Sequence, residues 1–244
     1  MATIYAGTSG WAYASWKPSF YPAKLASAKF LSYYAARLNT VEVNYTFRAR
    51  PTAKILAGWV LSTPPDFKFA VKAHQRITHI LRLYDAAAAT ADFLASLAPL
   101  HEANRLGPLL FQLPPFLKCD IARLDNFLAG LPRGTRAAIE FRHESWFTDP
   151  VYQRLRQANV ALCQAESEKL KTPDRATADY SYFRLRQEHY SPRELLAIRG
   201  QVNEAVRRGD VFVYFKHEDT PEGALYAESL LSRSAAASGA LPSG

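Results

Sequence analysis

Short β-rich runs alternate with segments of helical length and period along almost the whole chain, and this alternation most constrains the fold. Each run is rich in branched or aromatic residues, as expected for strands buried in a parallel sheet. Eight strands are predicted, at residues 4–8, 40–44, 67–73, 108–113, 137–142, 160–165, 180–186 and 210–216. An alternating pattern of this kind excludes all-α and all-β folds.

Seven connections between these strands carry a helical pattern. The predicted helices are Ser27–Leu38, Thr52–Leu61, Ala86–Ala103, Ile121–Leu128, Pro150–Ala158, Pro192–Arg208 and Glu222–Leu231. The sixth connection, Ser167–Ala178, is too polar to assign. Eight βα units in a chain of 244 residues favour a single-domain, TIM-like (β/α)8 barrel over a doubly wound open sheet. We expect the barrel to span residues 1–232 and residues 233–244, rich in Ala, Ser and Gly, to form a disordered tail.

Alternation within the strands predicts which side chains face the helices and which face the barrel interior. One parity is apolar and should pack against the helices: Val41, Val43, Phe67, Phe69, Val71, Leu109, Phe111, Leu113, Ile139, Phe141, Phe183, Leu185, Val211, Val213 and Phe215. The other parity is polar near the carboxyl ends of the strands: Glu42, Asn44, Lys72, His74, Gln112, Glu140, Arg142, Gln164, Glu166, Arg184, Arg186 and Lys216. Active sites of such barrels lie at that end.

The polar set supplies the candidate site. Paired carboxylates can donate and accept protons when a nearby cation keeps one ionised and burial raises the pKa of the other, so Glu42, Glu140 and Lys72 are the candidate catalytic residues. The candidate ligand-binding residues are Trp11, Asn44, His74, Gln112, Arg142, Trp146, Arg184, Arg186, Lys216 and His217. Five bases against three acids on the inward parity predict an anionic ligand. The alternative is a buried ionic network that only completes the packing.

The net charge of +8 is concentrated in the first third of the chain, where residues 1–84 hold 11 Lys and Arg but only Glu42 and Asp66 as acids. Such an excess attracts an anionic partner, either a small molecule or a nucleic acid. The loop after the first predicted strand and Trp146 add aromatic rings that could stack on a base or sugar. Packing of these rings onto the barrel mouth is the alternative.

Several chemistries lack their signatures. The chain contains no GxGxxG, Walker, GxSxG, HxH or HExxH motif, so nucleotide-binding loops, acyl-transfer triads and paired-histidine metal sites are not indicated. A metal held by Glu42, His74, Glu140, His143 and His217 is weakly supported, and the cofactor is otherwise unknown. Two distant cysteines and the absence of a signal peptide or long apolar segment predict a cytoplasmic protein with no membrane contact. The sequence does not indicate an oligomeric state.

Seven stretches of the chain resemble the YecE-like domain-of-unknown-function family. They are GTSGWAYASWKPSFYP (7–22), LNTVEVNYTF (38–47), FKFAVKAHQRITH (67–79), LGPLLFQLPP (106–115), EFRHESWF (140–147), YFRLR (182–186) and VYFKHED (213–219). The resemblance implies a TIM-like barrel but no settled activity. Many members read RLHG at the seventh strand and FNND at the eighth, where this chain has RLRQ (184–187) and FKHED (215–219), so Arg186 and Lys216 add basic character here.

Three functions remain open from the sequence. The first is an enzyme, a hydrolase or lyase, that acts on a phosphate-bearing or nucleotide-derived anion by carboxylate acid/base chemistry. The second is a nucleic-acid-binding or nuclease-like protein, whose binding would weaken steeply with salt. The third is a glycosidase that uses Glu42 and Glu140, whose separation would be about 5–5.5 Å for retention and about 6.5–9.5 Å for inversion.

Overall fold

The computed structural model describes residues 2–166, 170–216 and 219–238, the last six of these by their backbone alone. Within these ranges the chain forms one mixed α/β domain whose strands are parallel. The strands are β1 (Ile4–Thr8), β2 (Thr40–Val43), β3 (Lys68–Lys72), β4 (Leu106–Gln112), β5 (Ala137–Glu140), β6 (Ala161–Leu162), β7 (Gln164–Ala165), β8 (Ser181–Leu185) and β9 (Val211–Phe215).

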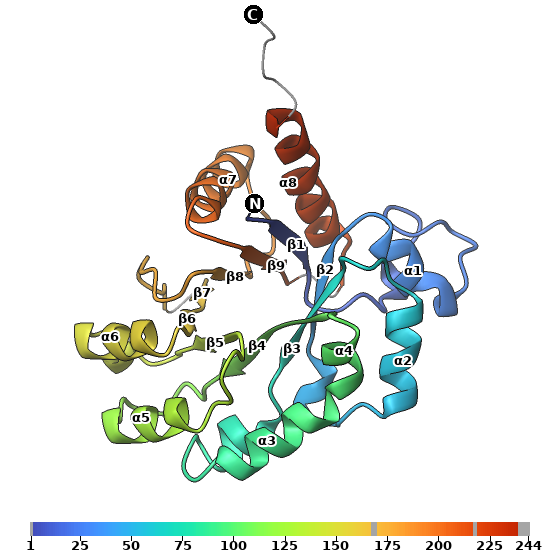
Figure 1. Ribbon diagram of the computed structural model, residues 1–244. Coiled ribbons are helices and arrows are strands. Elements are labelled where there is room, and N and C mark those ends of the chain that lie inside the picture. Colours follow the sequence, from blue (N-terminus) through green and yellow to red (C-terminus); the bar gives the residue numbers. More distant parts are fainter. Residues whose placement is uncertain (1, 167–169, 217–218, 239–244) are drawn as a thin grey trace, which may run out of the picture.

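The helices lie around the outside of the strands (Figure 1). They are α1 (Phe30–Ala35), α2 (Ala53–Leu61), α3 (Ala87–Ser96), α4 (Ala98–Glu102), α5 (Ile121–Ala129), α6 (Asp149–Gln157), α7 (Pro192–Val206) and α8 (Glu222–Ser238). Shorter turns occupy Ala14–Trp16, Ser27–Lys29, Tyr45–Phe47, Glu144–Trp146 and the π-helical Arg76–Ile80. The predicted helix 86–103 is therefore two helices, and α8 includes 233–238, the first half of the expected tail.

Local sequence explains where several helices begin. The Ser191 hydroxyl accepts from the backbone N–H of Glu194 while the Glu194 carboxylate accepts from that of Ser191, and Pro192 occupies the first turn of α7. The carboxylate of Asp120 caps α5 by accepting from the N–H of Arg123. These caps satisfy backbone donors that have no partner within their helices.

The strands form two sheets, in the orders β1-β9-β8-β7 and β2-β3-β4-β5-β6. The sheets meet between β1 and β2, where Ser9 and Glu42 form a single parallel bridge and the backbone N–H of Gly10 donates to the carbonyl of Glu42 at 2.9 Å. The side chain of Asn39 adds two bonds, accepting from the N–H of Ala6 and donating to the carbonyl of Ile4. Side chains and irregular backbone bonds therefore replace a regular ladder at this junction.

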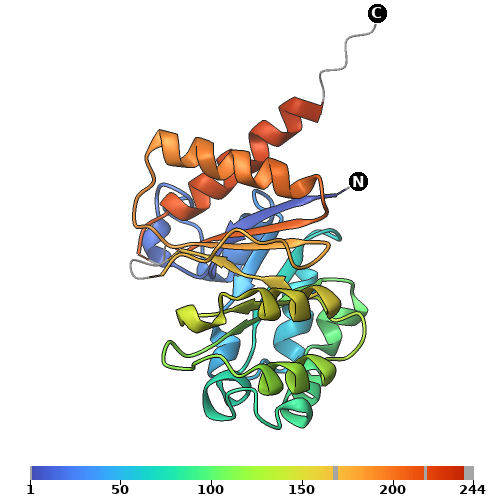
Figure 2. The ribbon, with the colours of Figure 1, turned by 90° about the vertical axis from the view of Figure 1, so that its left-hand side faces the viewer.

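All the strands run in one direction, which Figure 2 shows for β1 as it leaves the N-terminus on the right. Every expected helix-facing residue from Val41 to Phe215 lies in the larger hydrophobic core or packs against it. A second core lies on the other face of the strands. It contains Ala70, Leu110, Ala138, Ala161, Cys163, Ala165, Tyr180, Tyr182, Phe212 and Tyr214. Its small residues come mainly from β3 to β7 and its aromatic rings from β8 and β9 and the residue before β8.

The side chains of the sixth predicted strand face the opposite sides of the sheet from those expected. The strand is interrupted at Cys163, and Gln164 pairs with helix-facing Phe183 while Ala165 pairs with Arg184. Gln164 and Glu166 therefore do not share the face of Glu140. Strand alternation predicts that Cys163 faces the helices, but it is buried in the second core. The reason lies in residues 170–178, which contain no helix and cover this strand with polar groups: the Gln164 amide donates to the carbonyl of Pro173, and the Thr177 hydroxyl accepts from the N–H of Leu162.

Candidate functional site

Glu42 occupies the centre of a buried charged cluster at the carboxyl ends of the strands. Its side chain is inaccessible to solvent. It accepts bonds from Ser9 Oγ at 2.8 Å, Asn44 Nδ2 at 3.1 Å and Tyr182 Oη at 2.7 Å, besides two bonds from Arg184. Burial opposes ionisation of this carboxyl, but Arg184 and the hydroxyl donors outweigh it and lower its pKa to about 2.

Glu140, at the end of β5, is the second buried carboxylate. Its Oε1 accepts from Gln112 Nε2 at 2.9 Å, and Arg186 Nη2 donates to both of its oxygens at 2.8 and 3.0 Å. Burial again opposes ionisation, and Arg184 and Arg186 reverse that effect, so the pKa of Glu140 is lowered. The expectation that burial keeps one of the two carboxyls protonated is therefore wrong.

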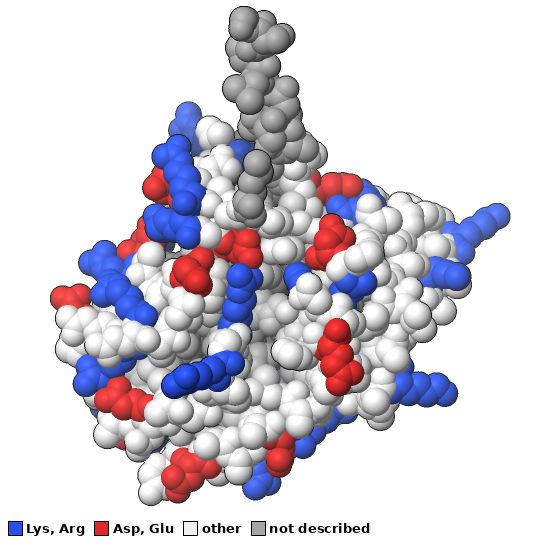
Figure 3. Space-filling view, in the orientation of Figure 1, with Lys and Arg blue, Asp and Glu red and all other residues white. Residues whose placement is uncertain are grey.

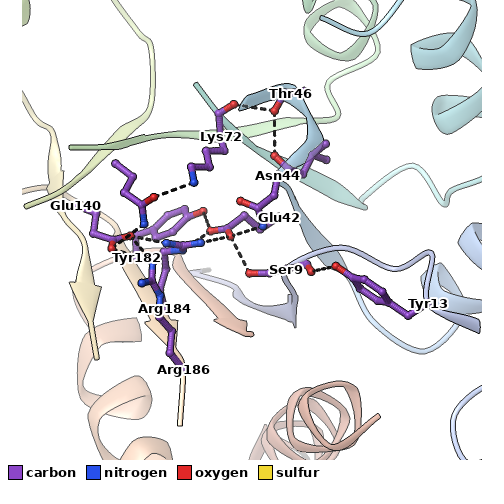
Figure 4. Close-up of polar contacts among 12 residues, drawn as sticks. Ser9, Tyr13, Glu42, Asn44, Thr46, Lys72, Glu140, Tyr182, Arg184 and Arg186 are labelled. Atoms are coloured by element: carbon purple, nitrogen blue, oxygen red, sulfur yellow. Dashed lines mark hydrogen bonds and ion pairs between the residues drawn. The ribbon is translucent and has the colours of Figure 1, made fainter. Parts of the chain in front are cut away.

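Arg184, in the middle of β8, lies between the two carboxylates (Figure 4). Its Nε and Nη2 donate to the two oxygens of Glu42 at 2.9 and 2.8 Å, and its Nη1 donates to Glu140. Burial opposes its charge but the two carboxylates dominate, so the pKa of Arg184 is raised well above its usual value. A planar guanidinium suits this arrangement because it can bind two carboxylates along different edges.

Lys72, the last residue of β3, extends toward the same cluster (Figure 4). Its Nζ donates to Gln112 Oε1 at 2.8 Å and lies 4.4 Å from the centre of the Phe47 ring. The other end of the Gln112 amide donates to Glu140, so one side chain links the amine to the carboxylate. Burial and the nearby Arg184 lower the pKa of Lys72 to about 8, against the opposing effect of Glu42 and Glu140. Lys72 is half-buried, and so its amine is less enclosed than either carboxylate.

Two buried polar atoms of the cluster have no hydrogen-bond partner among the described residues. Arg186 donates to Glu140 through Nη2 while its Nε makes no hydrogen bond, and Asn44 donates to Glu42 while its Oδ1 accepts none. The orientation of the Asn44 amide follows from the ionised state of Glu42, which requires a donor facing it. Among the described residues, the cluster therefore retains one buried donor atom, Arg186 Nε, and one buried acceptor atom, Asn44 Oδ1, without a hydrogen-bond partner.

Seven of the predicted site residues meet in this cluster: Glu42, Asn44, Lys72, Gln112, Glu140, Arg184 and Arg186. Sequence reasoning missed Ser9, Tyr182 and Phe47. Tyr182 has the same strand parity as Arg184, so alternation alone could have identified it. Ser9 follows the end of β1 and carries no comparable signal.

Other predicted ligand-binding residues lie elsewhere. Trp146 is fully buried against Phe141, and its indole N–H donates to the carbonyl of Leu117, which makes it a packing residue. Trp11 is half-buried and contacts the edge of Trp59 at 5.2 Å between ring centres. Three more predicted residues, His74, Arg142 and Lys216, lie outside the hydrogen-bonded cluster.

Of those three, His74 is half-buried, and its Nδ1 accepts from the backbone N–H of Arg76 at 3.2 Å. Arg142 and Lys216 are exposed, although Lys216 directly follows β9 and Arg142 lies two residues after the end of β5. His217 lies outside the described residues.

Within the described part of the chain, no group of three or more His, Cys, Asp or Glu side chains is arranged to hold a metal ion. Nor is any helix of the described residues both long and apolar enough to cross a membrane.

The fold and this cluster define a class of protein: a single α/β domain of parallel strands that brings a buried Glu–Arg–Glu network and a lysine to the carboxyl ends of its strands. The sequence profile of the family described as "Protein of unknown function DUF72" matches residues 5–243. The chain belongs to the DUF72 family.

Individual relatives agree with this assignment. The UPF0759 protein YunF of Bacillus subtilis (strain 168) is 35% identical over 161 residues, which are 62% of this chain and 55% of that protein. The chain thus matches about half the length of this curated relative. The crystal structure of a DUF72 family protein from Thermotoga maritima superimposes with a TM-score of 0.85 at 30% identity, covering 96% of this chain and 99% of that one. A DUF72 family protein from Enterococcus faecalis V583, at 22% identity and a TM-score of 0.75, covers 95% of this chain and 98% of its own and shares the fold.

Proposed function

We propose that the strands form a closed (β/α)8 barrel and that the protein is an enzyme acting on a small anionic molecule, with Lys72 transferring the proton. The position of the Lys72 amine, hydrogen-bonded to Gln112 beside a fully paired Glu–Arg–Glu network, is the observation that carries the enzymatic assignment. Barrel closure is supported by the contacts between Ser9, Gly10 and Glu42 at the junction of β1 and β2. The proposal counts β6 and β7 as one strand.

The carboxylates are less suited to proton transfer than Lys72. Both are ionised, and every carboxylate oxygen accepts at least one hydrogen bond from within the protein. We assign them the role of fixing Arg184 and of supplying the negative charge that partly offsets three cations. A lysine whose charge is opposed by burial and neighbouring guanidinium groups suits general base or nucleophilic chemistry near neutral pH.

An anionic ligand is supported by the balance of the cluster. While its amine is protonated, Lys72 adds a third positive charge to those of Arg184 and Arg186, against the two negative charges of Glu42 and Glu140, so an anion that binds to this form brings the site to neutrality. Arg186 Nε offers a donor and Asn44 Oδ1 an acceptor, which together suit a molecule carrying both an anionic group and a hydroxyl. Carboxylate, phosphate and nucleotide-derived compounds all meet this description.

The glycosidase alternative is less well supported. In a glycosidase the sugar linkage lies between the two carboxyl groups. Here the guanidinium of Arg184 bonds to both Glu42 and Glu140, so it occupies the direct path between them. A glycosidic bond would have to displace a buried, doubly paired arginine.

The first test follows acetylation of lysines by acetic anhydride across a range of pH, read by mass spectrometry. Lys72 should react with a midpoint near pH 8, and exposed Lys118 is followed as the comparison. A panel of phosphate and carboxylate compounds is then tested for selective protection of Lys72. Protecting compounds are assayed for turnover by the parent protein, Lys72→Met and Lys118→Met.

Turnover should rise as pH passes through about 8, because the unprotonated amine is the proton acceptor. It should be lost in Lys72→Met and retained in Lys118→Met. A Lys72 whose acetylation shows no midpoint near pH 8, or a Lys72→Met variant with normal turnover, would contradict the assignment.

A further inference from the structure

The exposed aromatic side chains of the described residues all lie at one end of the molecule. They are Tyr45, Tyr84 and Phe116, which are 43%, 64% and 62% exposed. Each belongs to a loop that follows one of three neighbouring strands, β2, β3 or β4. We call these loops, residues 44–52, 73–86 and 113–120, the aromatic rim. Large exposed rings that cluster in this way usually mark a binding surface.

The aromatic rim is also basic. Its exposed cations are Arg48, Arg50, Arg76, Arg82 and Lys118, against two acids, Asp85 and Asp120. The end of the molecule where the strands begin, which faces the viewer in Figure 3, has a different distribution, with acidic and basic side chains intermixed. The excess of positive charge in the first third of the sequence is therefore partly gathered into loops at the same end as the charged cluster.

The loop between β3 and α3, which carries Arg76, Arg82 and Tyr84, has an unusual backbone conformation. It contains the π-helical turn Arg76–Ile80, followed by non-glycine residues with left-handed backbone angles: φ is 53° at Arg82, 68° at Leu83 and 44° at Asp85. Such conformations persist only where surrounding structure enforces them, and they gather at binding and active sites. Leu83 anchors the loop, since it is 1% exposed and its N–H donates to the carbonyl of Ile77.

Contacts connect this loop to its neighbours and to the cluster. The Arg82 guanidinium lies over the Phe116 ring at 5.2 Å, which joins the loops after β3 and β4. The His79 ring contacts the Phe47 ring in a T-shaped arrangement, with 4.8 Å between ring centres. The amine of Lys72 lies over the same Phe47 ring, 4.4 Å from its centre. The aromatic rim is therefore continuous with the edge of the charged cluster.

We propose that the aromatic rim binds single-stranded nucleic acid, with Tyr84 and Phe116 stacking on bases and Arg48, Arg76 and Arg82 contacting phosphates. Rings interleaved with cations fit a polymer in which aromatic bases alternate with phosphates, and exposed bases are available only in single strands. An acidic peptide would satisfy the cations but offer few rings to stack. This inference does not depend on the reaction proposed for Lys72.

The test measures binding of a fluorescently labelled oligo(dT) of about 20 nucleotides by anisotropy at several salt concentrations from about 50 mM upward. Tyr84→Ala and Phe116→Ala should each weaken binding at least about fivefold without changing the salt dependence, because stacking is not ionic. Arg76→Ala should reduce the slope of log affinity against log salt by about 0.7, the value for one phosphate contact to a single strand.

Matched controls come from other surfaces. Arg133→Ala removes one exposed cation from the loop before β5, at the opposite end of the strands, and Leu196→Ala shortens a side chain that is 68% exposed on α7. Both should leave affinity and salt slope unchanged. Lys72→Met should retain oligo(dT) binding, which separates this inference from the proposed reaction.

Three results would overturn the inference. The first is an absence of oligo(dT) binding at the lowest salt concentration. The second is equal affinity for a duplex of the same length or for polyglutamate, which would mean that charge alone is recognised. The third is an equal loss of binding in the rim variants and in Arg133→Ala.

Discussion

Arg184 and Glu42, 142 residues apart in the sequence, form a buried two-pronged ion pair with donor–acceptor distances of 2.9 and 2.8 Å. The same guanidinium holds Glu140 through its remaining terminal nitrogen. Glu42 also bonds to Ser9 at the junction of β1 and β2. Arg184 on β8 is therefore connected both to this junction and to the end of β5, where Glu140 lies. Its loss should therefore affect stability and site geometry together.

Arg184→Met should lower the free energy of unfolding by about 3–5 kcal/mol, since two carboxylates would remain buried without their main partner. Urea denaturation measures the change. Arg207→Ala, which removes a pair whose side chains are 77% and 59% exposed, serves as the control and should stay within about 1 kcal/mol of the parent. An Arg184→Met variant as stable as the control would show that the network contributes little to folding.

Acid should destabilise the protein through the two buried carboxylates. The pKa of Glu42 is lowered to about 2 and that of Glu140 is also lowered, so both groups favour the folded state at any pH above their unfolded values. This contribution should decline as pH falls below about 4.5 and be exhausted only near the folded pKa of Glu42. Urea titrations from pH 6 to pH 2 should show a smaller pH dependence of the free energy of unfolding in Glu42→Gln than in the parent. An equal pH dependence would contradict the assignment.

Protonated Lys72 should destabilise the folded protein at neutral pH, and alkaline pH should remove this effect. Its folded pKa of about 8 lies below the ordinary lysine value of 10.5, so folding favours the neutral amine and its protonated form costs stability at neutral pH. That cost should disappear as pH rises from about 8 to 10.5. The stability of the parent relative to Lys72→Met should therefore increase over this interval, and a flat difference would show that the Lys72 amine titrates normally.

Gly7 tests the junction between β1 and β2. A Cβ at this position would lie 2.0 Å from the carbonyl oxygen of Thr40, so Gly7→Ala should push the strands apart and cost about 1–3 kcal/mol. Gly200→Ala on exposed α7 provides the comparison, because a Cβ there meets nothing within 4 Å. It should instead raise stability by about 0.5–1 kcal/mol. Thermal unfolding of both variants separates steric crowding from the general effect of replacing glycine.

Cys163 should resist thiol reagents in the folded protein. It is fully buried, and burial followed by the charge of Glu140 raises its pKa well above the usual value. Cys119 is partly exposed and should react first. Mass spectrometry after brief exposure to a polar maleimide distinguishes the two, and rapid labelling of Cys163 without unfolding would contradict its placement in the second core.

Strand alternation predicted the charged cluster because Glu42, Lys72, Glu140 and Arg184 all lie on strands whose opposite parity is apolar, apart from Ser181 at the start of β8. It failed at the sixth strand, where polar Gln164 bonds to the covering segment 170–178 instead of facing the expected barrel interior, and Glu166 accepts a bond from Tyr190. The sequence could not distinguish the charged cluster from the covering segment as the environment of these residues, because both offer hydrogen-bond partners to polar side chains. Trp146 was misread for a related reason: an aromatic residue after a strand can bind a ligand or pack, and only its contacts with Phe141 and Leu117 decide.

The second core combines small residues from one group of strands with aromatic rings from another, and this limits the order in which its residues can be substituted during evolution. Ala138 and Ala161 lie in the same core as the rings of Tyr182 and Tyr214, and all four side chains are buried. A larger residue at Ala138 has no free volume to occupy until one of those rings becomes smaller, while losing a ring first would leave a cavity. Divergence at this core should therefore proceed by paired changes of opposite size, which relatives with an alanine replaced by a larger residue can reveal.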